Sequence, residues 1–168
     1  PKLLYVIPTF QNPTGRTLGI GRRQEIARLA AKYGVVVLED DPYRDLRYTG
    51  EALPSIKAFD EAGFVVHLSS FSKLISPGLR LGAVCAEENL MRKLVIGKQA
   101  TDVHTSNLVQ AIVAEYLARG LLDAHIPQIC GLYGQHLARM ATHLEHFPEG
   151  TSYQIPDGGL FLWVELPQ

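Results

Sequence analysis

One lysine stands between a strand-like segment and a loop of small residues, in the stretch HLSSFSKLISPGLRLG. Ser70 and Ser72 precede Lys73, and Arg80 follows it seven positions later. Burial at the end of a strand drives a lysine toward the neutral amine, which forms Schiff bases with carbonyl compounds. Hydroxyl groups and a guanidinium nearby are donors that can hold a phosphate group. The stretch therefore indicates a site for a phosphorylated carbonyl compound.

Two further segments carry polar groups that would complete such a site. In FQNPTG, Asn12 offers hydrogen bonds, although the segment could equally be a plain turn. In EDDPY, Asp40 and Asp41 follow an apolar run, and Tyr43 comes next. The aspartates could instead cap a helix or bind a metal, but no histidine stands near them in the sequence. A carboxylate for a ring nitrogen and hydrogen bonds for a ring oxygen favour pyridoxal phosphate.

These polar segments all come directly after predicted strands. The strands are predicted for residues 3–8, 35–39, 64–69 and 81–86, with a helix between the first two that ends at Gly34. A strand, a helix and a second strand in succession imply a right-handed crossover and a largely parallel sheet. Ligands of such sheets bind outside the carboxyl ends of the strands, where the candidate residues stand.

The first helix is expected to turn one apolar side toward the sheet. Ile26, Leu29, Ala30 and Tyr33 recur at helical spacing, so we expect that side to be buried.

The second half of the chain has a mainly helical pattern. Helices are predicted from residue 87 to about residue 147, with Ser106 as an N-cap and Gly120 as a stop. Two short strands, TSYQIP and GLFLWVEL, close the chain around a Pro-Asp-Gly-Gly turn. Their aromatic side chains are expected to pack in the core, namely Tyr153, Phe161 and Trp163. A solvated helix face, rather than a zinc site, is expected for His125, His136, His143 and His146.

We predict an α/β fold with two parts. Residues 1–95 are assigned to part of a large domain with a mostly parallel sheet and flanking helices. Residues 96–168 are assigned to an interdomain helix and part of a smaller α+β domain. Because strand-like segments stand at both ends, we interpret the chain as a fragment of a longer protein, with a compact domain with short termini as the alternative.

The composition limits the classes of function. The 168 residues are 46% hydrophobic and 20% charged, with a formal net charge of −1. This charge gives no electrostatic argument for binding nucleic acid or a membrane surface, and no apolar run approaches the roughly 20 residues that span a bilayer. Cys85 and Cys130 form no disulfide framework, which favours a reduced, cytoplasmic protein.

The chain resembles the fold type I aminotransferases of class I/II over essentially its whole length. Its motifs stand in the family's order, as NPTG, D-x-x-Y, S-x-S-K and the arginine of GLRLG. It is most similar to the branch of 2-aminoadipate and aromatic aminotransferases. The resemblance implies a pyridoxal-phosphate enzyme that transfers an amino group from an L-amino acid to a 2-oxo acid. The alternative is the effector domain of a GntR-type regulator, which would bind nucleic acid only through an upstream DNA-binding domain.

The resemblance implies a role for each candidate residue. Lys73 would bind the cofactor covalently and move a proton at the substrate α-carbon. Only one of Asp40 and Asp41 can face the cofactor, because successive strand side chains point to opposite faces. The step of three residues to Tyr43 matches the family for Asp40, which would bind the pyridine nitrogen. The remaining cofactor ligands would be Asn12 and Tyr43 at the phenolic oxygen, and Ser70, Ser72 and Arg80 at the phosphate.

The resemblance also implies what the 168 residues lack. Part of the family's phosphate-binding loop and its arginine for the substrate carboxylate would lie outside the chain. Family members complete each site with residues of a second subunit, so the full-length protein would be a homodimer. We expect no metal, and we expect the isolated chain to be inactive. The peptide bond between Asn12 and Pro13 is a candidate for the cis form.

Overall fold

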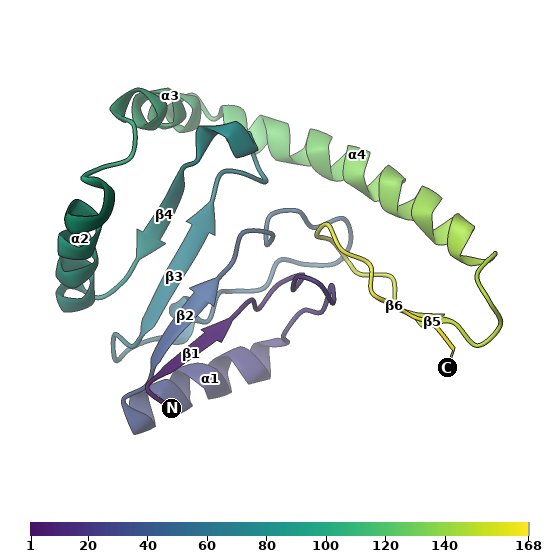
Figure 1. Ribbon diagram of the computed structural model, residues 1–168, viewed down its shortest axis with the longest axis horizontal. Coiled ribbons are helices and arrows are strands. Elements are labelled where there is room, and N and C mark those ends of the chain that lie inside the picture. The colour runs from purple at the N-terminus through teal and green to yellow at the C-terminus, as the bar shows by residue number, and fades with distance from the viewer. Residues whose placement is uncertain (168) are drawn as a thin grey trace.

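The computed structural model describes residues 1–167, which form a four-stranded sheet followed by three helices and a small strand pair (Figure 1). In the sheet, β1, β2 and β3 are parallel and β4 is antiparallel to β3. The order across the sheet is β1 (Leu3–Val6), β2 (Val36–Asp40), β3 (Val65–Ser70) and β4 (Gly82–Cys85). The predicted α/β fold with a mostly parallel sheet is confirmed, and each strand lies close to its predicted position.

Helix α1 (Ile20–Tyr33) lies against one face of the sheet (Figure 1). It ends at Gly34, whose left-handed φ of 61° is open to glycine at no steric cost, and whose N–H donates to the Ala30 carbonyl. A core of side chains from α1, β2, β3 and the loop between these strands joins helix and sheet, namely Ala27, Ala30, Val37, Ile56 and Val65. The prediction that Tyr33 lies on the buried side of α1 is wrong, because Tyr33 is 65% exposed.

Arg23 is fully buried on α1, which the apolar pattern did not predict. Its guanidinium donates to the carbonyl oxygens of Leu18, Pro54 and Pro8 and to the hydroxyl of Thr9, over 2.8 to 3.0 Å. Burial lowers the pKa of Arg23 from its usual value. Since a buried charge is tolerated when its donors are satisfied, Arg23 can hold the loop after β1 against the helix.

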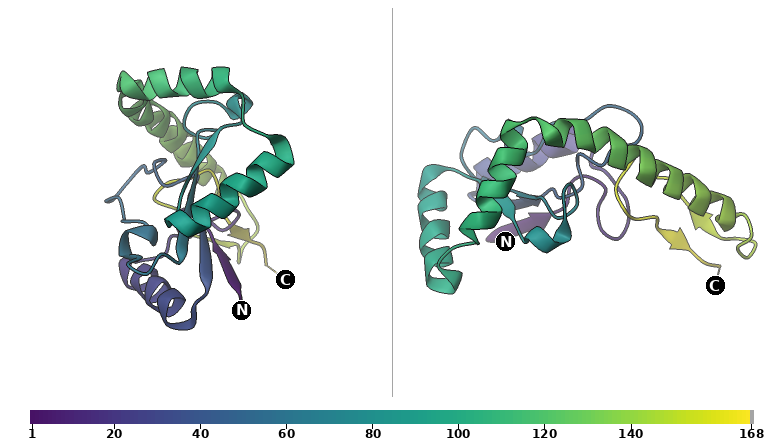
Figure 2. Two further views of the ribbon diagram at one scale, coloured as in Figure 1. Left: turned by 90° about the vertical axis from the view of Figure 1, so that its left-hand side faces the viewer. Right: turned by 90° about the horizontal axis from the view of Figure 1, so that it is seen from above.

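Three helices follow the sheet, namely α2 (Glu88–Asp102), α3 (Asn107–Ala118) and α4 (Leu121–Leu144). Helix α4 has 24 residues, about 36 Å at 1.5 Å per residue. It runs from α3 toward the C-terminal strand pair, so that α2 and this pair lie at opposite ends of the molecule (Figures 1 and 2). Ser106 is the N-cap of α3, as predicted, but its side chain accepts no capping hydrogen bond from the described residues.

The two C-terminal strands are shorter than predicted. They are β5 (Ser152–Tyr153) and β6 (Val164–Glu165), which pair antiparallel. The residues between them turn back to the loop after β2, where the Gly159 N–H donates to the Leu46 carbonyl at 2.8 Å. These backbone groups therefore bond to another loop instead of extending the strand pair. Within residues 1–167, Tyr153 and Trp163 are exposed and do not pack in a core as expected.

Gly158 permits this close approach. A Cβ built at Gly158 would lie 2.2 Å from the Leu46 carbonyl oxygen and about as close to the ring of Phe10, at 2.5 Å. Any side chain there would have to displace backbone. The Gly-Gly turn therefore locks the C-terminal segment onto the loops that follow β1 and β2.

No helix within residues 1–167 combines the length and apolar character needed to cross a membrane.

Candidate functional site

The candidate residues begin at the carboxyl ends of two neighbouring strands. Asp40 is the last residue of β2 and pairs in register with Leu68 of β3. Ser70 is the last residue of β3 and pairs with Gly82 of β4. The strands β2 and β3 run parallel (Figure 1), so their last residues, Asp40 and Ser70, lie at the same edge of the sheet. This is the edge at which ligands of parallel sheets bind.

Lys73 lies in the connection that follows β3. The connection opens with a turn in which the Ser72 N–H donates to the Ser70 hydroxyl at 3.2 Å. The Phe71 N–H donates to the Leu81 carbonyl at 3.1 Å, which closes the loop from residue 71 to residue 81. Lys73 therefore sits within a closed loop at the end of β3, next to both serines.

Arg80 belongs to the same loop and has an unusual backbone. Its φ and ψ are 50° and 39°, a left-handed conformation that is uncommon for residues other than glycine. Strained backbone of this kind often occurs at functional sites. The guanidinium donates to the Pro77 carbonyl at 3.4 Å, a long contact for an N–H···O bond. A ligand at this edge would offer these donors better acceptors.

Asn12 and Tyr43 lie on the loops that follow β1 and β2. The peptide bond between Asn12 and Pro13 is cis, as expected. Tyr43 is buried, and its ring meets that of Phe161 edge-on, with centroids 5.4 Å apart and planes at 85°. Edge-to-face contact is a favoured aromatic geometry. The C-terminal segment therefore fixes the ring of Tyr43.

Asp40 faces away from α1. The alternate residues Val37 and Glu39 are buried on the α1 side, so Asp40 points to the opposite face. There its Oδ2 accepts a hydrogen bond from the phenol of Tyr5 at 2.5 Å. This bond, with some help from burial, raises the pKa of Tyr5 to about 12. The sequence analysis did not predict the contact between Tyr5 and Asp40. The only feature of the sequence that could have indicated it is a tyrosine hydroxyl on the strand that precedes β2.

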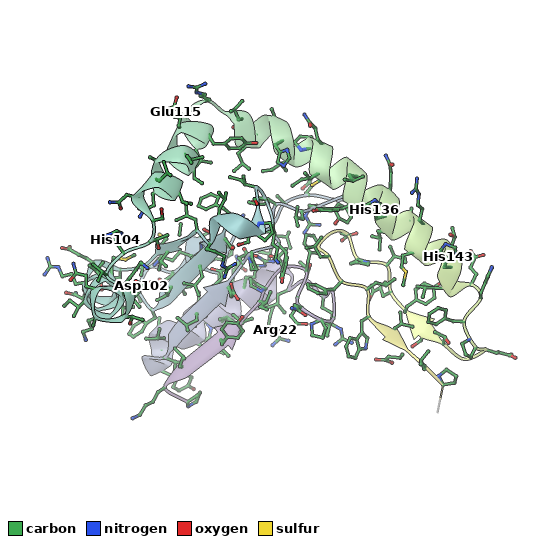
Figure 3. The ribbon with its side chains drawn as sticks, turned by 45° about the horizontal axis from the view of Figure 1, so that its top comes forward. Arg22, Asp102, His104, Glu115, His136 and His143 are labelled. Atoms are coloured by element: carbon green, nitrogen blue, oxygen red, sulfur yellow. The ribbon has the colours of Figure 1, made fainter. Side chains whose placement is uncertain are left out.

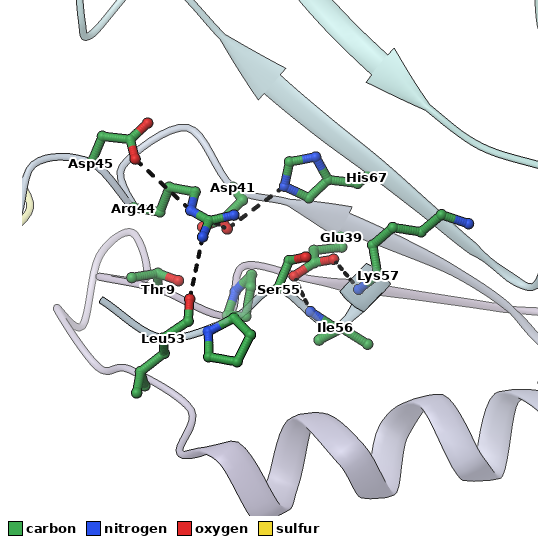
Figure 4. A network of polar contacts seen from close by, with 12 residues as sticks. Thr9, Glu39, Asp41, Arg44, Asp45, Leu53, Ser55, Ile56, Lys57 and His67 are labelled. Carbon is green, nitrogen blue, oxygen red and sulfur yellow. Dashed lines mark hydrogen bonds and ion pairs between the residues drawn. The ribbon is translucent and has the colours of Figure 1, made fainter. Parts of the chain in front are cut away.

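Asp41 is buried on the other side of the sheet end, beside a histidine. Its Oδ2 lies 3.7 Å from Nε2 of His67 and 3.8 Å from Nε of Arg44 (Figure 4). Neither of its oxygens accepts a hydrogen bond from the part of the chain that the structure describes. The sequence analysis placed no histidine near the aspartates, and this is corrected. The pairing of β2 with β3 sets His67 opposite Glu39 and so beside Asp41.

Glu39, Asp41 and His67 form a grouping of possible metal ligands, with one ligand atom of each within 4.8 Å of the others. However, the carboxylate of Glu39 already accepts the N–H groups of Ile56 at 2.7 Å and Lys57 at 2.8 Å (Figure 4). A guanidinium next to Asp41 also balances part of the negative charge. The grouping is thus explained as a structural network that anchors the loop between β2 and β3.

The histidines of the second half lie apart from this grouping. His136 and His143 are on α4, and His104 lies between α2 and α3 (Figure 3). Nδ1 of His104 lies 2.9 Å from the carbonyl oxygen of Thr105, a local contact at the start of α3. The position of the His104 side chain is therefore explained by this contact at the start of α3.

The sequence pattern of the family described as aminotransferase class I and II matches residues 2–168. The chain belongs to this family. The aminotransferase chain is 44% identical to aromatic-amino-acid aminotransferase 1 of Thermococcus litoralis and 40% identical to 2-aminoadipate transaminase of Thermus thermophilus. The matches cover 99% and 100% of this chain but 40% and 43% of those proteins. The chain therefore spans about two fifths of the length of these curated relatives.

The fold of this aminotransferase chain matches solved relatives closely. The crystal structure of Pyrococcus horikoshii kynurenine aminotransferase, in complex with PMP, gives a TM-score of 0.96 at 42% identity. The match covers 99% of this chain and 42% of that one. A Bacillus subtilis protein described as the uncharacterized HTH-type transcriptional regulator YisV is 35% identical, over 97% of this chain and 34% of its own. The relatives of this chain therefore include both aminotransferases and a transcriptional regulator, the two classes expected from the sequence.

The donor set at the sheet edge fits the cofactor of this family. An amine, a carboxylate, two hydroxyls and a guanidinium lie at or just beyond the ends of β2 and β3, namely Lys73, Asp40, Ser70, Ser72 and Arg80. These groups match the aldehyde, the ring nitrogen and the phosphate of pyridoxal phosphate in chemical type.

Proposed function

We propose that the whole protein is a pyridoxal-phosphate-dependent aminotransferase that moves an amino group from an L-amino acid to a 2-oxo acid. The observation that carries this proposal is the meeting of Asp40, Ser70 and Lys73 at one sheet edge. The relatives with aromatic, kynurenine and 2-aminoadipate aminotransferase names support aromatic amino acids and 2-aminoadipate as the first donors to test.

Lys73 is the proposed catalytic residue. Bound pyridoxal phosphate supplies an electron sink for the bonds of the substrate α-carbon. The amine of Lys73 would hold the cofactor covalently between turnovers. When free, it would move the proton between the substrate α-carbon and the cofactor. A neutral amine is needed for this proton transfer.

Asp40 is the proposed partner of the pyridine nitrogen. Its position at the end of β2, on the face away from α1, supports this role, whereas Asp41 lies buried on the α1 side. A carboxylate there keeps the proton on the ring nitrogen, which strengthens the electron demand of the ring.

The remaining candidate residues orient the cofactor. Asn12 and Tyr43 are proposed to bind the phenolic oxygen, and the contact of Tyr43 with Phe161 supports a fixed ring position. The two serines at the end of β3 and Arg80 are proposed to bind the phosphate, for which guanidinium and hydroxyl donors are well suited. Holding the reacting groups in this way contributes much of the rate in such reactions.

We also propose a domain assignment, an oligomeric state and a location for the whole protein. We propose that residues 1–95 belong to the large, cofactor-binding domain and residues 96–168 to the interdomain helix and small domain. Exposed apolar side chains on α2 and α3, such as Ile96 and Leu108, support a cover from the rest of the protein or from the second subunit of a homodimer. A cytoplasmic location is supported by the free thiols of Cys85 and Cys130. The 168 residues alone are proposed to be inactive.

The experiment purifies the whole protein, adds pyridoxal phosphate and records the visible absorption band of the lysine-bound cofactor. Lys73→Ala is expected to remove this band, and wild type is expected to form glutamate from 2-oxoglutarate with phenylalanine or 2-aminoadipate as donor. A wild-type protein that forms no covalent bond with the cofactor would contradict the proposal. Lys73→Arg serves as a matched control, since it keeps a positive charge but cannot form the bond.

A regulator is the second candidate function, and the 35% identity to a protein described as an HTH-type transcriptional regulator favours it. Such a protein would also bind the cofactor through Lys73, so the band alone does not separate the two. Transfer of the amino group to 2-oxoglutarate at enzymatic rates separates them, because a regulator would instead show cofactor-dependent DNA binding with little turnover.

A further inference from the structure

Tyr5 lies on the strand next to β2 and on the same face as Asp40. In the pairing of β1 with β2, Tyr5 is opposite Leu38, two positions before Asp40. Side chains two positions apart on a strand point to the same face. The tyrosine thus reaches diagonally along the face, toward the end of β2 where the candidate site begins.

The phenol of Tyr5 engages one oxygen of this carboxylate. Its Oη donates to Oδ2 of Asp40 at 2.5 Å, a length typical of a hydrogen bond from a hydroxyl to a charged oxygen. A direct hydrogen bond from the phenol to this carboxylate points to a role for the hydroxyl itself.

We infer that Tyr5 is a positioning residue that orients the carboxylate of Asp40 toward the cofactor by its hydrogen bond to Oδ2, so that the proton stays on the pyridine nitrogen. This inference rests on the proposed function, in which Asp40 binds that nitrogen. Tyr5 lies outside the family motifs NPTG, D-x-x-Y, S-x-S-K and GLRLG.

The direction of the effect follows from a shared proton. Between a pyridine nitrogen and a carboxylate, the proton can reside on either partner. A hydrogen bond donated to the carboxylate stabilises its negative charge, and therefore favours the pair in which the nitrogen carries the proton. Without the phenol, the carboxylate becomes the better proton acceptor, and the ring nitrogen loses part of its positive charge.

The phenol can keep this role over a wide pH range. Because the bond to Asp40 raises the pKa of Tyr5 to about 12, the hydroxyl remains a donor at every physiological pH. The same bond leaves one oxygen of Asp40 for the ring nitrogen, since only Oδ2 accepts from Tyr5.

The test compares Tyr5→Phe with wild type in the whole holoenzyme, loaded with pyridoxal phosphate that carries ¹⁵N in its ring. The ¹⁵N chemical shift of the bound ring is expected to move from the pyridinium range toward the neutral pyridine range in Tyr5→Phe. We also expect kcat to fall by roughly tenfold with little change in KM, since a hydrogen bond to a charged group is lost. A matched control is Tyr33→Phe, an exposed tyrosine on α1, which should leave both readouts unchanged.

A second variant guards against a folding defect. Replacement of Tyr5 by 3-fluorotyrosine keeps the size of the ring and makes the phenol a stronger donor, so the ¹⁵N shift should move toward the pyridinium limit. Equal ¹⁵N shifts in wild type, Tyr5→Phe and the fluorotyrosine protein would overturn the inference. If instead the wild-type ring nitrogen is unprotonated, or Asp40→Asn leaves its shift unchanged, the proposed function of Asp40 is wrong. The two failures are therefore distinguishable.

Discussion

Asp40 and Asp41 are neighbours in the chain, but their side chains lie on opposite sides of the sheet. Asp40 ends β2 and accepts a hydrogen bond from Tyr5 on the face away from α1. Asp41 is only 2% exposed and lies 3.7 Å from Nε2 of His67 on the other side. The alternation of strand side chains separates the two carboxylates, so substitutions at the two positions should have different consequences.

Asp40→Ala is expected to reduce the rate of amino transfer far more than Asp41→Ala, because only Asp40 is placed to bind the ring nitrogen. Asp41→Ala should act mainly on folding and lower the free energy of unfolding by about 1–3 kcal/mol, since it leaves the partly buried His67 and Arg44 without their carboxylate. Steady-state kinetics and urea unfolding of the whole protein measure the two effects. The reverse ranking of the kinetic effects would refute the assignment of Asp40.

The titration of Tyr5 provides a second prediction. Its phenol should ionise near pH 12, and Asp40→Asn should bring this value back toward the ordinary 10.0, because the largest cause of the shift is the bond to Asp40. A raised folded-state pKa means that the stabilising effect of the bond is complete below pH 10 and is lost as the pH rises through about 12. NMR of protein labelled at the tyrosine ring carbons measures the titration, with Tyr33→Phe to assign an exposed reference signal. A Tyr5 signal that titrates near pH 10 in wild type would show that the bond does not form in solution.

Glu39 should be required for stability rather than for catalysis. Its buried carboxylate accepts the N–H groups of Ile56 and Lys57. Glu39→Gln replaces one acceptor oxygen with an amide donor, and this leaves a backbone N–H unsatisfied. We expect the free energy of unfolding to fall by about 1–3 kcal/mol, measured by urea denaturation. The matched control is Glu61→Gln at an exposed position, for which a change within about 0.5 kcal/mol is expected. An equal effect of the two substitutions would count against the anchoring role.

Two Gly→Ala substitutions should have opposite signs. Gly158→Ala would set a Cβ 2.2 Å from the Leu46 carbonyl oxygen, and the fixed backbone there cannot yield easily. We expect a loss of about 3 kcal/mol in the free energy of unfolding, together with weaker cofactor binding because the contact of Phe161 with Tyr43 is disturbed. Gly131→Ala on α4 meets nothing within 4 Å. It should therefore stabilise the protein by about 0.5–1 kcal/mol. Thermal melting of both variants checks the signs, and a harmless Gly158→Ala would mean that the C-terminal segment is not locked in place.

The sequence alone determined those features that depend on residues close together in the chain. Apolar runs predicted the four strands, and Gly34 predicted the end of α1, because strand alternation and helix termination are set by local backbone preferences. The order of the motifs around Asn12, Asp40 and Lys73 likewise indicated the family, since such spacing is a property of the chain itself.

Local pattern failed where a distant partner decided the outcome. The helical spacing of α1 suggested that Tyr33 would be buried, yet it is exposed, while Arg23 is buried because carbonyl oxygens from distant loops satisfy its donors. The C-terminal strands are short because the segment between them bonds to Leu46 in another loop. No periodicity within a segment reports which remote groups will complete its hydrogen bonds.

The tertiary structure alone decided which side chains meet at the ends of β2 and β3. The pairing of β2 with β3 brings His67 to Asp41, and the pairing of β1 with β2 brings Tyr5 within reach of Asp40. The members of these pairs lie 26 and 35 residues apart in the chain (67 minus 41, and 40 minus 5). A shift of one residue in either register would turn one partner to the other face and break the contact that this pairing forms. The sequence thus names the chemical groups of the site, whereas strand register determines which of them act together.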